Sequence, residues 1–191
     1  DVSGATLTKA NFTEVTLDSA DLSKAVLEQA CFLGATMQEA RLVGAKASCT
    51  DFSRAVLDNA DLSRSELKAA KFDGTVLTLA KLVGANAEGA DFTSADMSGA
   101  DVSGATLTKA NLTGAQLEQV QGLTAAQVAS AANVQGAKLS GLDFSGQDLS
   151  KVDLSKCDLT GCNLEGGNLE GCNLEGTNLT GAKLEQVQGL T

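Results

Sequence analysis

The sequence predicts a solenoid, a chain wound into stacked coils, and its repeat pattern is the basis for this fold class. Every fifth residue from 2 to 117 is apolar, and a small residue, usually Ala, stands two positions before it. A second run in a shifted register extends from 134 to 184. A period of five fits neither an α-helix nor a flat strand. The chain must therefore turn a corner in each repeat and bury its apolar side against neighbouring coils.

The spacing of phenylalanines indicates how many repeats form one coil. Five of them recur at intervals of 20 residues, as expected if four repeats make a coil and like residues stack. They are Phe12, Phe32, Phe52, Phe72 and Phe92. When the 12 residues that interrupt the register are removed, Phe144 joins this series. We therefore expect all six rings to form one stacked column on one inner face.

The repeat unit resembles that of a known family. The unit A-[DN]-L-x-x occurs as ADLSK at 20–24 and as ANLTG at 110–114, and similar units fill almost the whole chain. These units resemble the pentapeptide-repeat family, including its abundant cyanobacterial members. The resemblance implies an all-β fold: a right-handed parallel β-helix with four sides, here a solenoid of about nine coils.

The interruption between the two runs carries helix signals. Within residues 120–131, Thr124 and Gln127 have capping-box spacing, and Leu123 and Val128 have hydrophobic-staple spacing. Ala-rich sequence follows, so the segment predicts a short helix. The helix could be a connector packed on the stack or a contact element for a partner.

These signals divide the chain into three segments of one continuous stack. We expect coils 1–6 over residues 1–119, a helical excursion over 120–131, and coils 7–9 over 132–191. The helix itself is predicted at about 125–131.

Composition excludes several classes of function. The 14 Lys+Arg against 24 Asp+Glu give a net charge of −10, which opposes direct binding to nucleic-acid phosphates. The chain has no His, so it lacks the imidazole base of Ser-His-Asp and Cys-His enzymes. No stretch approaches the ~20 apolar residues of a membrane span. We expect no enzyme activity, no cofactor and no membrane or nucleic-acid partner.

The five cysteines do not suggest a reactive or metal site. Cys157, Cys162 and Cys172 occupy small inward positions, where Cys packs as a small hydrophobe, and Cys31 and Cys49 point outward on different faces. An odd count without stacked pairs predicts free thiols and a cytoplasmic protein. No four ligands converge, so no metal site is expected.

Asp and Asn residues often precede the central apolar residue, as at Asp143, Asp148 and Asp153. They recur with the repeat, so we expect them to bond to the backbone of turns. Clustered acidic loops of the calcium-binding type are absent from the sequence.

One outward side of the first six coils is acidic and carries no Lys or Arg. Its acidic residues are Asp18, Glu39, Asp58, Asp96 and Glu118. Some family members inhibit bacterial DNA gyrase by resembling DNA, so the resemblance implies DNA mimicry as one possible role. Nine coils spaced ~4.8 Å apart would form a rod with one net negative charge per ~4 Å of its length, whereas duplex DNA carries one per ~1.7 Å of its axis. The charge density of the rod is therefore lower than that of DNA. A solubilising role is the simpler interpretation.

Outward apolar residues form a second candidate surface. Val56, Val76 and Leu79 point outward on that same side in adjacent coils, and Val83 lies just past the corner. A contiguous patch of this kind marks a partner contact.

The sequence therefore predicts a non-enzymatic structural or interaction solenoid with a protein partner. The alternative is a DNA-mimic regulator that binds DNA gyrase or another DNA-handling protein through its acidic face. Open end coils would expose core and strand edges, so end-to-end self-association is also expected.

Overall fold

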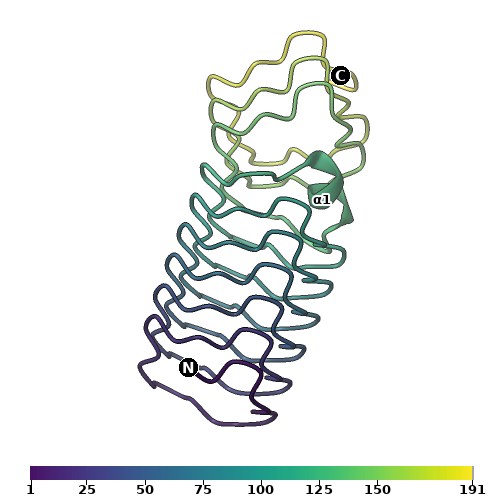
Figure 1. Ribbon diagram of the computed structural model, residues 1–191. Helices are drawn as coiled ribbons and strands as arrows, with labels where there is room; N and C mark the ends of the chain where they lie inside the picture. The colour runs from purple at the N-terminus through teal and green to yellow at the C-terminus, as the bar shows by residue number, and fades with distance from the viewer. Residues whose placement is uncertain (191) are drawn as a thin grey trace.

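The computed structural model describes residues 1–190, which wind into a four-sided rod of stacked coils (Figure 1). Successive coils pair through parallel bridges between residues 20 apart, such as Thr6 with Val26 and Val26 with Lys46. Within residues 1–190, the bridges are isolated and no longer strand forms. The one helix of this range is α1 (Ala125–Ser130).

A five-residue repeat with Asp or Asn before its central residue can satisfy all five of its backbone N–H groups. Two N–H groups donate to the next coil, one donates to the previous coil, one closes the turn, and one donates to an Asp or Asn side chain. In the repeat 60–64, Leu62 N–H donates to Lys81 O (2.7 Å) and Arg64 N–H donates to Val83 O (2.9 Å), both in the next coil. Asp61 N–H donates to Ala40 O of the previous coil (2.9 Å). Ala60 N–H closes the turn on Leu57 O (3.0 Å), and Ser63 N–H donates to Asp61 Oδ1 (3.0 Å).

The corners require a left-handed backbone at the second residue after the central one. Glycine occupies many of these positions because it has no Cβ to clash, as at Gly44 (φ 66°). Lys24 takes the same conformation one coil earlier (φ 58°), and its Cγ lies 3.9 Å from where a Cβ of Gly44 would be. Arg64 and Gly84 repeat this arrangement. Long side chains at this corner therefore lie over a glycine of the following coil.

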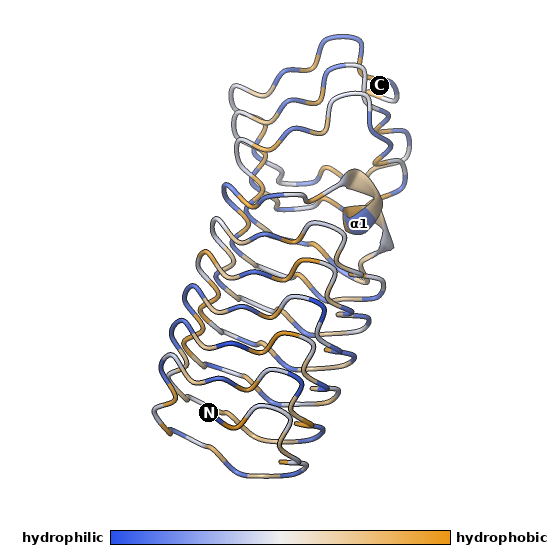
Figure 2. Cartoon of the chain, in the orientation of Figure 1, coloured by the Kyte–Doolittle hydropathy of each residue, from blue (hydrophilic) through white to orange (hydrophobic). Residues whose placement is uncertain are grey.

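The core is built from the two inward residues of every repeat, and apolar and polar residues alternate along each coil (Figure 2). We number the sides by their central residues in one coil: Leu22 on the first, Leu27 on the second, Phe32 on the third and Met37 on the fourth. All four of these side chains are buried.

The predicted phenylalanine column is confirmed for the first five rings, which stack on the third side. Adjacent centroids are 4.9 Å apart for Phe12–Phe32, 5.2 Å for Phe32–Phe52, 5.1 Å for Phe52–Phe72 and 4.8 Å for Phe72–Phe92. The rings are within 12° of parallel.

The prediction that Phe144 joins this column is wrong. Asn133 bridges to Asn111 and Lys138 bridges to Gln116, so the seventh coil is offset by 22 residues and the net insertion is two. The segment 121–132 therefore replaces two sides of a coil and is not an added excursion. Val134 continues the third side above Leu112, and Phe144 falls on the opposite, first side, where it is buried.

The predicted helix is confirmed, and its contacts explain why it stays within the stack. Thr124 and Gln127 form the capping box, and the helix buries Ala125 and Val128. Gln127 Nε2 also donates to two carbonyls of the sixth coil, Val102 O at 3.0 Å and Ala105 O at 2.9 Å. A single glutamine thus caps α1 and fixes it to the coil below.

Candidate interaction surfaces

The five predicted acidic residues all lie on the fourth side, but their environments differ. Asp18 and Glu39 are exposed, while Asp58, Asp96 and Glu118 are half-buried. Asp96 accepts from Ser98 N–H at 3.0 Å and Ser98 Oγ at 2.6 Å, so its carboxylate serves its own turn. We call Asp18, Glu39, Asp58, Asp96 and Glu118 the acidic face.

A glutamine links two members of the acidic face across three coils. Gln38 donates from its backbone to Asp18 Oδ1 at 2.9 Å and from its side chain to Asp58 Oδ2 at 3.3 Å. Ser19 Oγ donates to Glu39 Oε2 at 3.5 Å. These neutral partners hold the carboxylates in place without neutralising their charge.

Ion pairs of residues 1–190 lie on the other three sides. Arg41 meets Asp21 at 3.7 Å on the first side, Lys68 meets Glu88 at 3.1 Å on the second, and Lys71 meets Asp51 at 3.7 Å on the third. The fourth side has no such pair among the described residues, and its first Lys is Lys138 on the seventh coil. The acidic face is therefore unpaired along the first six coils.

The apolar patch, defined as Val56, Val76, Leu79 and Val83, interrupts the acidic face. Val56 bridges to Val76 on the adjacent coil, and Leu79 is 55% exposed. A Cβ on Gly99 would lie 2.8 Å from Leu79 Cδ2, so the leucine side chain covers this glycine of the next coil. Val56, Val76 and Val83 are half-buried. The fourth side thus carries an apolar centre with carboxylates before and after it.

Leu79 has an unusual backbone for its side chain. Its φ is 58°, and it is the one leucine, isoleucine, valine or aromatic residue with positive φ in residues 1–190. The other non-glycine residues at such corners are polar, apart from Ala69 and Cys49.

The inward cysteines are structural. Their thiols donate to carbonyls of the coil below: Cys157 to Val134 O at 3.0 Å, Cys162 to Leu139 O at 3.0 Å and Cys172 to Leu149 O at 2.7 Å. Burial raises the pKa of Cys157 to about 11 and also raises the pKa of Cys162 and Cys172. Protonated thiols are poor nucleophiles and poor metal ligands.

Among residues 1–190, the outward cysteines, Cys31 and Cys49, form no disulfide, and neither do the inward three. Within residues 1–190, no group of three or more His, Cys, Asp or Glu side chains is arranged to hold a metal ion. The same residues include no helix long and apolar enough to cross a membrane.

The aspartates before central residues bond to turns, as expected. Ser145, Ser150 and Ser155 N–H donate to Asp143, Asp148 and Asp153 at 2.9, 2.9 and 3.0 Å. These bonds, with those from the serine hydroxyls, lower the pKa of each carboxyl.

One feature not foreseen from the sequence is a cavity of about 310 Å³ beside α1, lined by Val128, Val134 and Val152 among others. The helix signals at 124–128 predicted the helix that forms one side of the cavity, but nothing in the repeat pattern indicated an open space.

The comparisons with known proteins agree with this geometry. The family model described as pentapeptide repeats (8 copies) matches residues 1–34, 35–74, 60–99, 70–108, 88–120, 130–166 and 157–188. The unmatched residues between 120 and 130 fall largely on α1. No curated protein matches the chain significantly.

Similar solved structures share the solenoid. HetL, a pentapeptide repeat protein of the cyanobacterium Nostoc sp. involved in heterocyst differentiation regulation, is 26% identical with a TM-score of 0.52, over 96% of this chain and 89% of that chain. QnrB1, a plasmid-mediated fluoroquinolone resistance protein, is 22% identical with a TM-score of 0.49, over 94% of this chain and 89% of that chain. The predicted right-handed parallel β-helix is confirmed, and the chain belongs to the pentapeptide-repeat family.

Proposed function

We propose that this protein is a non-enzymatic scaffold that binds a protein partner through its fourth side. The apolar patch would form the centre of the contact, and the acidic face would form its rim. Protein interfaces have this arrangement, with a desolvated apolar core inside a polar border. The complementary partner is a protein with an apolar pocket or ridge flanked by Lys and Arg.

The observation that carries the proposal is Leu79. A left-handed backbone destabilises an L-residue by roughly 1–2 kcal/mol, and exposing a large apolar side chain gains nothing in the isolated protein. Leu79 has both features, with φ 58° and 55% exposure. The left-handed backbone belongs to the corner and recurs throughout the rod, so what sets Leu79 apart is a large, exposed apolar side chain at a position that otherwise holds Gly or, apart from Ala69 and Cys49, a polar residue. We infer that the leucine is there to contact a partner.

The alternative is a DNA-mimic regulator of DNA gyrase or another DNA-handling protein. The absence of described ion pairs from the fourth side favours it. The apolar patch argues against it, because Val76 and Leu79 break the row of carboxylates in the fourth coil. HetL is involved in regulation, which supports a binding role over a catalytic one.

A cytoplasmic location is part of the proposal. It rests on the five free thiols, which are typical of a reducing compartment.

The test compares two leucine variants in partner capture. Leu79→Asn removes the apolar contact and suits the left-handed backbone, since Asn tolerates it well. Leu33→Asn is the matched control, because Leu33 is also exposed (37%) but lies on the third side. We expect Leu79→Asn to fold at least as stably as the unmodified protein. A protein retained from a cell extract by the unmodified chain and by Leu33→Asn, but lost with Leu79→Asn, would be the partner.

A supercoiling assay separates the two functions. Inhibition of gyrase that disappears in Asp58→Lys and persists in Leu79→Asn would favour DNA mimicry. If no captured protein depends on Leu79, the apolar patch is not the binding site.

A further inference from the structure

Neighbouring coils of the regular stack are bonded on all four sides. On the first side, between the fourth and fifth coils, Leu62 N–H donates to Lys81 O at 2.7 Å, and Lys81 N–H donates to Ala60 O at 2.9 Å. Arg64 N–H donates to Val83 O at 2.9 Å. The other three sides of these two coils repeat this set of three bonds. The two coils are therefore held together around their whole perimeter.

Between the seventh and eighth coils, the fourth side has this complete set. Leu139 N–H donates to Asp158 O at 2.8 Å, and Asp158 N–H donates to Ala137 O at 3.0 Å. Gly141 N–H donates to Thr160 O at 2.9 Å. The chain also passes from the seventh coil into the eighth at the corner after Gly141. At this side, three main-chain bonds and the chain itself join the two coils.

Few bonds cross the same junction on the third side. Among residues 1–190, its one main-chain bond runs from Gly136 N–H to Ser155 O at 3.0 Å. A side-chain bond from Gln135 Nε2 to Asp153 Oδ2, at 2.7 Å, adds to it. Two of the three ladder bonds of a regular side are therefore missing here.

The first and second sides, where residues 121–132 replace the repeats, are joined to the eighth coil by a single hydrogen bond. Ala125 N–H donates to Gln147 Oε1 at 2.8 Å. No other hydrogen bond among residues 1–190 links this segment to residues 142–151. The junction is thus bonded fully along one edge and sparsely on the sides away from it.

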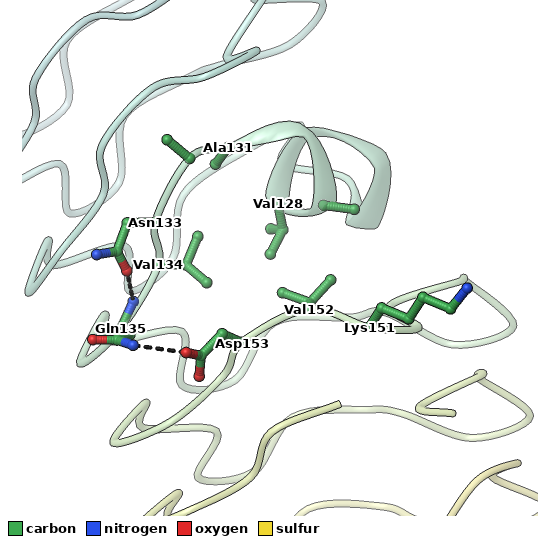
Figure 3. Close-up of a pocket in the computed structure, with 10 residues that line it drawn as sticks. Val128, Ala131, Asn133, Val134, Gln135, Lys151, Val152 and Asp153 are labelled. Carbon is green, nitrogen blue, oxygen red and sulfur yellow. Dashed lines mark hydrogen bonds between the residues drawn. The ribbon is translucent and has the colours of Figure 1, made fainter. Parts of the chain in front are cut away.

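The cavity of about 310 Å³ lies at the sparsely bonded part of the junction. Figure 3 shows Val128 pointing from α1 toward Val152 of the eighth coil. Both side chains are buried, so apolar contacts close this part of the junction. No complete ladder supports these contacts, and the cavity beside them leaves part of the interface unfilled. Opening the junction here breaks fewer interactions than separating two coils of the regular stack.

The parts of the chain on either side of the junction are each continuously bonded. The helix belongs to the part before it, because Gln127 Nε2 binds the carbonyls of Val102 and Ala105 in the sixth coil, at 3.0 and 2.9 Å. We call residues 1–141, which include α1 and the seventh coil, the lower body.

The eighth and ninth coils regain the regular ladder. On the second side, Leu149 N–H donates to Asn168 O at 2.9 Å, and Asn168 N–H donates to Gln147 O at 3.0 Å. The other sides of these two coils are bonded in the same way. We call residues 142–190 the upper body.

We propose that the junction is a hinge with its axis along the fourth side, about which the upper body swings as a unit. Domain hinges of this kind need a few residues that absorb the change in backbone angles. Gly141 (φ 74°) stands where the chain crosses the junction, beside the bonds that stay intact. Swinging opens the side of α1, which lies away from the axis.

The position of the axis sets the direction in which the rod bends. When the side of α1 opens, the fourth sides of the two bodies turn toward each other, and this side of the rod becomes concave. The fourth side of the lower body carries the acidic face and the apolar patch, so the hinge would let the rod close on a partner held there. The hinge is a property of the isolated chain, and it does not depend on the proposed function.

Distances between spin labels, measured by pulsed electron paramagnetic resonance, test the hinge. The second-side pair joins the native Cys49 to Lys151→Cys, at exposed corners of the third and eighth coils (φ 58° and 63°). The control pair joins Lys9→Cys to Lys109→Cys, at the same corner of the first and sixth coils. Both pairs span five coil spacings, about 24 Å, but the control pair lies within the lower body.

A third pair tests the direction of bending. Asn59→Cys and Gly161→Cys lie at exposed fourth-side corners of the third and eighth coils, and a Cβ on Gly161 meets no atom within 4 Å. In every pair the other outward cysteines are replaced by Ser. The three inward thiols stay, since burial raises their pKa and so slows labelling.

We expect the control pair to give one narrow distance distribution. The second-side pair should extend to longer distances, because its labels lie across from the axis. The fourth-side pair should extend to shorter distances, because its labels lie outside the axis on the concave side. Circular dichroism melting would confirm that the labelled variants fold.

A disulfide across the third side should close the hinge. Gln135→Cys with Asp153→Cys replaces the two side chains that meet across the junction. Thr93→Cys with Asn111→Cys is the matched control, because these side chains meet in the same way between two coils of the lower body, at 2.8 Å. We expect oxidation of the junction pair to slow hydrogen exchange of the Ala125 amide at least about fivefold, and oxidation of the control pair to change it less than about twofold.

Three results would overturn the proposal. Equal widths for the second-side and control distributions would show that the junction is as stiff as the regular stack. Lengthening of both the second-side and the fourth-side distances would show a junction that loosens as a whole, without an axis on the fourth side. Exchange of the Ala125 amide at the same rate in the oxidised and reduced junction variant would show that closing the third side does not hold the side of α1.

Discussion

The coils below α1 and the coils above it use the same repeat with different core residues. Below α1, the small inward position of each repeat holds mostly Ala, and five central Phe stack in one column. Above α1, Cys157 and Cys162 take small positions, and Leu154 follows Val134 on the third side. Yet the ladder between coils is the same in both regions. The regions therefore differ in packing, and the weak point of the rod lies between them, where the ladder is interrupted.

Small inward side chains with a donor make the same hydrogen bond in the coils below and above α1. Below α1, Thr50 Oγ1 donates to Leu27 O and Thr75 Oγ1 to Phe52 O, both at 2.7 Å. Above α1, Cys157 and Cys162 donate their thiols to carbonyls in the same relative position, 23 residues earlier. A small inward side chain with one donor fits because that carbonyl has a second lone pair beyond its turn bond.

The largest expected effect tests the difference in packing. Phe52 lies between Phe32 and Phe72, at 5.2 and 5.1 Å, while Phe144 is buried without a described ring neighbour. We expect Phe52→Ala to destabilise the protein by about 3–5 kcal/mol. Phe144→Ala should cost about 1–3 kcal/mol less, because stacked pairs add about 0.5–1.5 kcal/mol each.

Urea denaturation of both variants measures this difference. Equal losses would mean that ring stacking adds nothing to burial. A loss below about 1 kcal/mol for Phe52→Ala would contradict the column as a stabilising element.

Residue patterns predicted the column and the helix because both follow from fixed spacings in the sequence. The column follows from the 20-residue spacing of Phe12 to Phe92, which equals one coil, and the helix follows from the capping-box spacing of Thr124 and Gln127. The position of Phe144 was missed because counting residues cannot reveal whether a helix stands outside a coil or replaces two of its sides. Six helical residues span only about 9 Å, so α1 can bridge a short path within the stack.

The candidate surfaces were predictable to a similar degree. Outward positions of Asp58, Val76 and Leu79 follow from the period of five, and the positive φ of Leu79 follows from its corner position. The gap between the seventh and eighth coils could not be predicted, because it results from ladder bonds that are missing between distant residues, such as Val134 and Asp153.

A second prediction concerns the junction between the two regions. Gln127→Ala removes the capping-box partner and both side-chain bonds to Val102 O and Ala105 O. We expect a loss of about 1–3 kcal/mol, from a lost cap and from Ala105 O, which is left without a donor, while Val102 O keeps the turn bond from Ala105 N–H at 3.0 Å. Hydrogen exchange should accelerate in α1 and in residues 143–162 more than in residues 21–100.

Gln116→Ala is the matched control, because the Gln116 side chain is half-buried and makes no hydrogen bond among those of residues 1–190. Uniform acceleration along the rod in Gln127→Ala would show that the junction does not divide it.

The smallest expected effect is a pH dependence concentrated above α1. In the eighth coil, Asp143, Asp148, Asp153 and Asp158 precede the central residue on each of the four sides, and hydrogen bonds from the following Ser or Thr lower the pKa of every one. A carboxyl whose pKa is lower in the folded chain stabilises it above the unfolded value, and this stabilisation is lost as the pH falls below about 4. Acid should therefore loosen the eighth coil first, beside the interrupted ladder.

The matching variant replaces these four residues with Asn, which accepts the same turn bond without a charge, as Asn173 does from Glu175 N–H at 3.1 Å in the next coil. We expect the urea midpoint of the unmodified protein to fall more between pH 7 and pH 3 than that of the variant. Hydrogen exchange at the lower pH should show the added opening at 143–162, after correction for the intrinsic rate. An identical pH dependence in the two proteins would mean that these carboxylates contribute to the turns only as acceptors, which a neutral amide replaces fully.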